Sequence, residues 1–138
     1  MRRLRDDHGQ VTVLVLGMAL VVFGVSGLAA DGTRAFLFRR SLQNTADAAA
    51  LAGASEIDHA AYYATGGRRV TLDRSAAGVV ARRWLARRSL GATGYVEVSA
   101  RSVHVVLRGR VPTLFLRVVG VDDLPVAVEA TSSPISGR

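Results

Sequence analysis

The chain has 138 residues and a mass of 14.6 kDa, which suits one small domain, and its mean hydropathy is +0.25. All 18 basic residues are arginine, which against 11 acidic residues gives a formal net charge of +7. There is no cysteine, which excludes disulfides, thiol catalysis and cysteine-ligated metal sites. The three histidines, His8, His59 and His104, are far apart in the sequence. We therefore expect no metal site and no cofactor.

The most apolar segment is an uncharged run of twenty residues, 11–30. As a helix it is about 30 Å long, the thickness of the hydrocarbon core of a bilayer. A short head, residues 1–10, precedes it and contains three arginines. The alternative is a cleaved secretory signal, for which Gly27-Leu28-Ala29 resembles a small-x-small cleavage site. The length of the run and the helical pattern after it favour an uncleaved membrane anchor.

The orientation of this anchor is not decided by charge alone. Three arginines precede the run, and Arg34, Arg39 and Arg40 follow it closely, so the counts on the two sides are equal. The immediate N-terminal flank and the long C-terminal part favour an N-terminus inside the cell. We expect a single-pass protein of the inner (cytoplasmic) membrane with its C-terminal domain outside.

Small residues are spaced at helical intervals along the span. Gly17, Gly24 and Asp31 are seven residues apart and therefore lie on one face of a helix. Such a face allows a partner helix to approach closely. Glycine is also simply tolerated in membrane helices, and this interpretation stays open beside the first.

Helix-forming residues without proline continue from residue 31 to residue 55, with Gly32 as the weak point where the helix leaves the bilayer. Arg39, Gln43 and Asp47 are four residues apart and can bond along one face. Another face is made almost entirely of small side chains, and we expect it to dock on helices of partner subunits. Its members are Leu42, Ala46, Ala49 and Gly53.

The N-terminal region carries a recognisable succession of motifs: Gly9-Gln10, the apolar run, Asp31-Gly32-Thr33-Arg34, and then SLQNTADAAALAGA over residues 41–54. It resembles TadE/TadG-like proteins, the pseudopilins of tight-adherence (Flp) pilus systems, and most of all the short actinobacterial type found in secretion-gene neighbourhoods. The residues that carry the motif are Asp31, Gly32, Leu42, Gln43, Asp47, Ala48, Ala49, Leu51 and Ala52. The resemblance implies a bitopic protein that serves pilus or secretion-machine assembly, with other pilin-like or Tad subunits, or further copies of itself, as partners.

One feature departs from processed members of that family, which are cut after a glycine and carry glutamate at the fifth mature position. Gly9 fits the cut site and Gln10 would become the new N-terminus, but the fifth residue is Leu14. A glutamate inside an apolar span is costly and needs a partner, such as a neighbouring N-terminus. Its absence predicts an accessory subunit that is unprocessed or inefficiently processed.

The region after residue 55 predicts a turn at 65–69 and then a helix over 74–90, capped by Asp73 and ended by Gly91. We interpret Trp84 as a buried anchor rather than as a stacking platform for nucleic acid. The apolar face of this helix comprises Ala77, Val80, Ala81, Trp84 and Leu85, flanked by Arg82, Arg83, Arg87 and Arg88.

After Gly94 the apolar period changes to two, which predicts a hairpin of residues 95–99 and 103–107, extended to Pro112. His104 on the second strand is expected to be a surface or packing residue. For 113–119 a short helix capped by Thr113 is narrowly favoured over a strand. Residues 121–125 are expected to form a turn and residues 126–131 a last strand.

The predicted fold class is α+β and pilin-like: a long N-terminal helix, membrane-spanning in its first half, a second helix and a small antiparallel sheet. No catalytic motif is present, so we expect no enzyme. An Arg-rich DNA- or surface-binding module and a secreted domain are the alternatives, although scattered arginine pairs make nucleic acid a poor candidate. The expected segments are a cytoplasmic head (1–10), the span (11–30), its helical continuation (31–55), a small domain (56–131) and a mobile tail (132–138).

Overall fold

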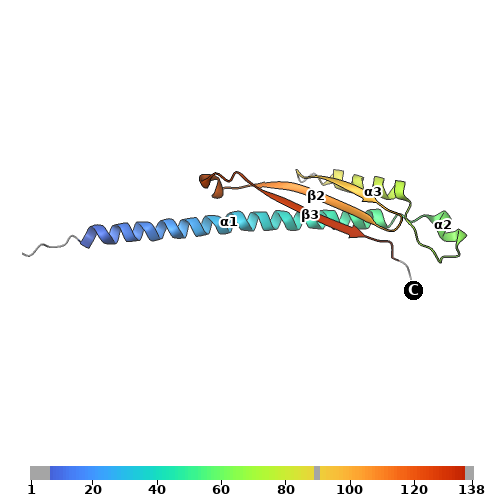
Figure 1. Cartoon of the computed structure of the whole chain (residues 1–138), viewed down its shortest axis with the longest axis horizontal. Helices are drawn as coiled ribbons and strands as arrows, with labels where there is room; N and C mark the ends of the chain where they lie inside the picture. The colour runs from blue at the N-terminus through green and yellow to red at the C-terminus, as the bar shows by residue number, and fades with distance from the viewer. Residues whose placement is uncertain (1–6, 89–90, 136–138) are drawn as a thin grey trace, which may run out of the picture.

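The computed structural model describes residues 7–88 and 91–135 of the chain. Its architecture is α+β, as predicted, with a long helix, shorter helices and one antiparallel sheet (Figure 1). The expected head and tail lie partly outside the described residues, at 1–6 and 136–138.

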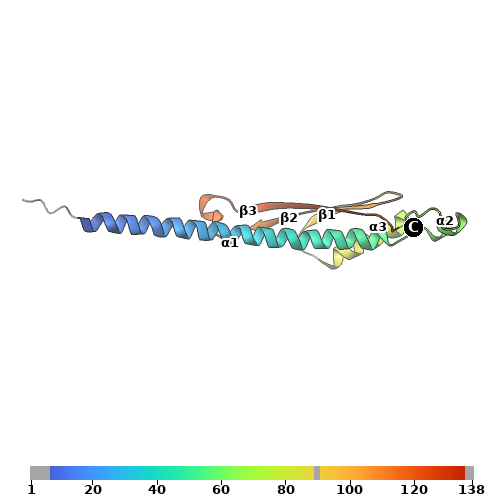
Figure 2. The ribbon, with the colours of Figure 1, turned by 90° about the horizontal axis from the view of Figure 1, so that it is seen from below.

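Helix α1 (Asp7–Ala54) is a single helix of 48 residues, and Gly32 does not interrupt it. Its first half projects away from the rest of the molecule, and its second half runs beneath the sheet (Figures 1 and 2). Residues 10–26 are exposed all round, and nearly all of them are apolar. Among the described residues, α1 is the one helix long and apolar enough to cross a membrane.

The sheet has three antiparallel strands in the order β1 (Thr93–Val98), β2 (Val103–Pro112) and β3 (Asp123–Ser132). The predicted hairpin is confirmed, with Val96 opposite Val105. The expected turn at 121–125 is wrong in its second half, because β3 already begins at Asp123. Pro125 is tolerated in this strand because β3 lies at the edge of the sheet, where a missing N–H costs no ladder bond.

Two shorter helices connect α1 to the sheet. Helix α3 (Arg74–Arg87) begins as predicted, because the Asp73 side chain accepts hydrogen bonds from the N–H groups of residues 75 and 76. It ends earlier than predicted, because Arg88 leaves the helical conformation, and Leu90 lies outside the described residues. Helix α2 (His59–Ala64), capped by Asp58, was not predicted, whereas the turn after it is confirmed by positive φ at Gly66 and Gly67.

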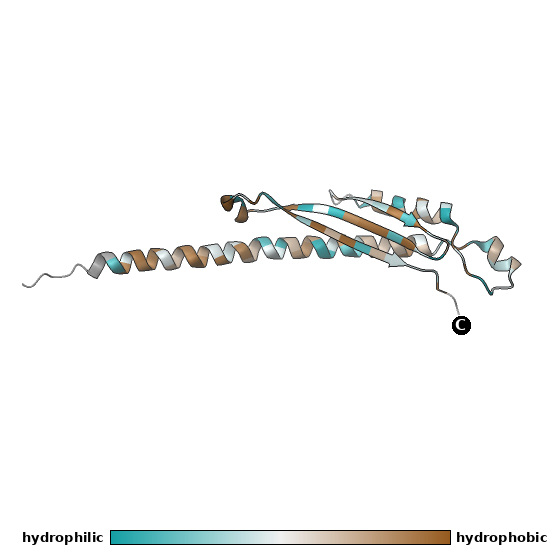
Figure 3. Ribbon diagram, in the orientation of Figure 1, coloured by the Kyte–Doolittle hydropathy of each residue, from teal (hydrophilic) through white to brown (hydrophobic). Residues whose placement is uncertain are grey.

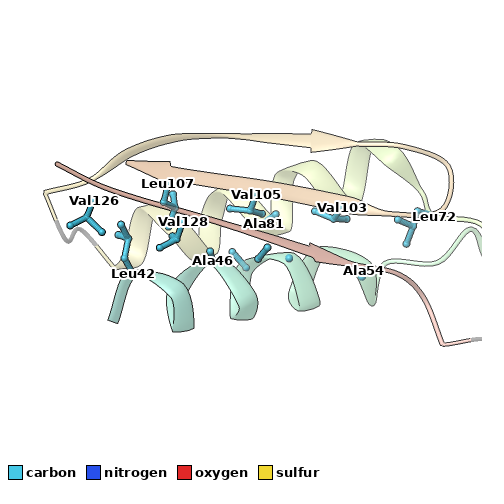
Figure 4. Close-up of a cluster of buried hydrophobic side chains, with 14 of the residues drawn as sticks. Leu42, Ala46, Ala54, Leu72, Ala81, Val103, Val105, Leu107, Val126 and Val128 are labelled. Carbon is cyan, nitrogen blue, oxygen red and sulfur yellow. The ribbon is translucent and has the colours of Figure 1, made fainter. Parts of the chain in front are cut away.

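The core lies between the inner face of the sheet and the helices α1 and α3 (Figure 4). Leu42, Ala46 and Ala49 of α1 are fully buried there. At Gly53 the helices approach so closely that a Cβ would stand 3.0 Å from the Ala77 carbonyl oxygen. The valines that cover this face come from β2 and β3 and include Val103, Val105, Val126 and Val128. The small-residue face therefore does receive a helix, but it is α3 of the same chain together with the sheet.

This arrangement corrects the expectation that the face of Ala46, Ala49 and Gly53 docks on helices of other subunits. The side chains of Ala46 and Ala49 are 0% exposed, so a partner would reach them only if the domain opened. Small side chains admit any close neighbour, and within this fold the sheet and α3 fill that position.

The segment between β2 and β3 contains the 3₁₀ helix η1 (Leu116–Val119), so helix rather than strand is confirmed there. The expected cap is wrong. Thr113 is buried, and its hydroxyl donates to the carbonyl oxygens of Val121 and Asp122, so it closes the base of the loop instead.

Candidate assembly surfaces on the long helix

The first half of α1, whose residues 10–26 are all exposed and which we call the free half, offers an open apolar surface. Outside the helix's own backbone, no atom of the described residues lies within 4 Å of the point where a Cβ would stand on Gly17 or Gly24. The large side chains around them, among them Val21 and Phe23, are about two-thirds exposed. The glycine face is thus accessible to lipid or to another helix.

Asp31, the third member of the seven-residue spacing, does not share that open face. It is 1% exposed, and its carboxylate accepts three backbone hydrogen bonds from the β2–β3 loop at 2.8–2.9 Å. The donors are the N–H groups of Leu114, Phe115 and Leu116. The small-residue spacing indicated a partner helix at this position, and the structure places a capped loop of the same chain there instead.

The electrostatics of Asp31 follow from these contacts. The N–H of Leu116, and then those of Leu114 and Phe115, stabilise the carboxylate and lower the pKa of Asp31 below its ordinary value. The positive charge of Arg34 acts in the same direction, while burial opposes it. Asp31 is therefore ionised at neutral pH and caps the start of η1 from a distant part of the chain.

A second contact fastens the same loop to α1. The ring of Phe115 lies over Gly27, where a Cβ would stand 2.5 Å from the ring atoms, and meets Phe23 edge-on with ring centroids 5.6 Å apart. In the sequence, Gly27 stands out only as part of a small-x-small motif that resembles a cleavage site. Its role depends on Phe115, 88 residues further along the chain, and no local pattern reveals that pairing.

The motif residues on the second half of α1 divide between the inside and the outside of the domain. Gln43 donates hydrogen bonds to Asp47 and to the carbonyl oxygen of Glu129 on β3, both at 3.0 Å. The bond to Asp47 confirms the expected pairing of Gln43 with Asp47 along this face. Gly32 is exposed, with open space around it.

The other motif residues, Ala48, Leu51 and Ala52, line a shallow apolar groove together with Trp84 and Ile135. Trp84 is half-buried against the core, and the guanidinium of Arg88 lies 5.4 Å from the centre of its ring. Its indole Nε1 is buried and has no hydrogen-bond partner among the described residues. These contacts fit the interpretation of Trp84 as an anchor.

On the outer face of the sheet, the Nδ1 atom of His104 is hydrogen-bonded to the Thr131 hydroxyl at 2.8 Å, as suits a surface residue. Within residues 7–88 and 91–135, no cluster of three or more histidine or acidic side chains is placed to hold a metal ion.

Comparison with known families bears on α1. Residues 9–56 match the model of the putative Flp pilus-assembly TadE/G-like family. This region is TadE/G-like. The match covers α1 almost entirely and stops before α3 and the sheet, and it confirms the resemblance read from the motifs of this helix. No curated protein and no solved structure matches the chain.

Proposed function

We propose that the chain is a membrane-anchored TadE/TadG-like pseudopilin, or an accessory subunit, of a Flp/Tad pilus or of a type II/IV-like secretion assembly. One observation carries the proposal: α1 is uninterrupted, with a first half exposed all round and apolar, and a second half that forms part of the domain core. An apolar surface of that extent needs lipid or protein to cover it. The chain acts by packing rather than by catalysis, which the TadE/G-like match also supports.

The proposed topology places the N-terminal head in the cytoplasm, residues 11–30 in the inner membrane and the C-terminal domain outside. Because the chain has no cysteine, single cysteines report the topology cleanly. Arg101→Cys, in the exposed β1–β2 turn, should react with a membrane-impermeant maleimide in intact spheroplasts. Asp6→Cys, in the head, should react only after lysis. The reverse pattern would overturn the orientation, and recovery of both variants in the soluble fraction would overturn the anchor.

Lateral association through the face of Gly17 and Gly24 is the proposed assembly contact. Gly24→Leu fills that face and should reduce both cross-linking between copies and the amount of subunit in the assembled surface fraction. Ala19→Leu is the matched control, because Ala19 is exposed and lies about 200° around the helix from Gly17. Assembly of Gly24→Leu at the level of Ala19→Leu would remove this contact from the proposal.

The N-terminus is proposed to remain unprocessed. Leu14 stands where processed members have glutamate, and the bond between Gly9 and Gln10 lies in the first turn of α1. Mass spectrometry of the protein purified from its membrane should give the intact N-terminus. A mature chain that begins at Gln10 would contradict the accessory role.

A further inference from the structure

The loop between β2 and β3 (residues 113–122) carries large apolar side chains that neither α1 nor the sheet covers. Leu114, Val118 and Val119 are 61%, 87% and 74% exposed. Figure 3 shows this strongly hydrophobic end of the domain beside α1, on the side of the free half of the helix. A soluble loop of this size rarely exposes so many apolar side chains together.

The loop lies level with the end of the apolar run. Phe115 contacts Phe23 and Gly27, and Asp31 accepts hydrogen bonds from the backbone N–H groups of residues 114–116. Phe23 is seven residues before Ala30, the last residue of the uncharged run, which corresponds to about 10 Å along the helix axis. Any membrane that holds residues 11–30 therefore also reaches the loop.

The backbone of the loop is prepared for an apolar environment, in which an unpaired N–H is costly. The Asp31 carboxylate accepts hydrogen bonds from three consecutive backbone N–H groups at the start of η1. Other N–H groups of the loop donate to carbonyl oxygens within the loop. The paired N–H groups are those of Thr113, Leu114, Phe115, Leu116, Val118, Gly120 and Val121.

We propose that the β2–β3 loop inserts into the outer interfacial region of the phospholipid bilayer, beside the span of its own chain. This inference rests on the proposed membrane anchor. The depth set by the contacts of Phe115 agrees with the 5–10 Å to which interfacial segments bury their apolar side chains. Arg117, exposed and paired with Asp122 at 3.5 Å, can extend its guanidinium to headgroup phosphates while its stem stays among apolar groups. Lipid is the group that covers the apolar side chains of the loop, because the loop lies beside the span of its own chain and lipid surrounds that span in every copy.

Site-directed spin labelling tests the proposal with the full-length protein in nanodiscs of phosphatidylethanolamine and phosphatidylglycerol, at one chain per disc. A nitroxide at Val118→Cys reports on the loop, Val22→Cys is the reference inside the span, and Arg101→Cys is the reference in water. The ratio of oxygen to nickel-chelate accessibility at position 118 should approach that at position 22 and exceed that at position 101 several-fold.

The outcomes distinguish failure of the proposed loop insertion from failure of the proposed membrane anchor. If position 118 behaves like position 101 while position 22 remains lipid-protected, the anchor stands and the insertion is wrong. If position 22 is itself open to the nickel chelate, the anchor fails and the insertion fails with it. Protection of position 118 that arises only when several chains share a disc would assign the loop to a neighbouring subunit and overturn the lipid contact. Leu114→Cys, at an exposed position before η1, repeats the measurement in case the label at position 118 disturbs η1.

Discussion

The side-chain amide of Gln43 donates a hydrogen bond to the carbonyl oxygen of Glu129 at 3.0 Å and so ties the long helix to an edge strand. Edge strands present unpaired backbone groups that can recruit foreign strands. Gln43 covers one of these groups on β3 and is itself held by Asp47. A residue of the TadE/TadG-like motif thus contributes to the integrity of a single subunit.

Replacement of Gln43 should therefore lower stability. Gln43→Ala is expected to reduce the free energy of unfolding by about 1 kcal/mol, the usual net contribution of such a hydrogen bond. Gln43→Glu should cost more, because it places a carboxylate against a carbonyl oxygen and the Asp47 carboxylate. Urea unfolding in micelles, followed by the fluorescence of Trp84, measures both. Asn44→Ala, at an exposed neighbouring position, is the control, and an equal loss in that variant would contradict the role of Gln43.

Enlarging Gly27 should displace the β2–β3 loop. The Cβ of Gly27→Ala would stand 2.5 Å from the Phe115 ring, whereas Gly24→Ala, one turn earlier, projects into open space. Hydrogen exchange at the amides of residues 114–116 should accelerate at least several-fold in Gly27→Ala and stay unchanged in Gly24→Ala. Equal protection in the two variants would mean that Phe115 does not rest on Gly27.

The hold of Asp31 on the loop should weaken in acid. The pKa of Asp31 is lower in the folded chain than in the unfolded chain, where it is about 3.9. The ionised Asp31 therefore contributes fully to stability at a pH above its unfolded-chain pKa. This contribution is lost as the pH falls through its folded-chain pKa. Protection of the Leu116 amide, relative to that of Val105 in the central strand, should therefore decrease below about pH 4. In Asp31→Ala it should be low at every pH, and a pH dependence that persisted there would assign the effect to another group.

Ala49→Leu should destabilise the domain itself. Ala49 is fully buried between α1, α3 and the sheet, and extra methylenes in a packed core cost about 1–3 kcal/mol. Asn44→Leu, on the exposed side of the same helix, should change stability little. Thermal unfolding followed by circular dichroism compares the two. A fully stable Ala49→Leu chain that fails to assemble would restore the idea that this face meets a partner.

Much of the fold was predictable because it depends on local patterns. The unbroken helix-forming run gives α1, alternation around Val96 and Val105 gives the hairpin, and Asp73 marks the start of α3. The occupant of the small-residue face was not predictable, because alanine and glycine accept any close neighbour.

Less of the candidate assembly surface than of the fold could be predicted from the sequence. The partnerships of Asp31 with the loop and of Gly27 with Phe115 join residues more than 80 positions apart. Spacing within one segment holds no information about such pairs. Thr113 also looked like a helix cap from its neighbours alone, but the buried base of the loop uses its hydroxyl instead.

Helix α1 passes without a break from its free apolar half into the domain core, and Asp31 and Phe115 fasten the β2–β3 loop to it. The free half of α1 and the domain are therefore fixed relative to each other in rotation about the helix axis. A rotation of the free half of α1 about the helix axis therefore rotates the whole domain through the same angle. In the proposed assembly, the face of α1 that contacts a neighbouring copy within the bilayer would therefore also determine which edge of the sheet faces that copy outside the bilayer. Contacts among membrane helices would in this way set the handedness of any array these subunits build.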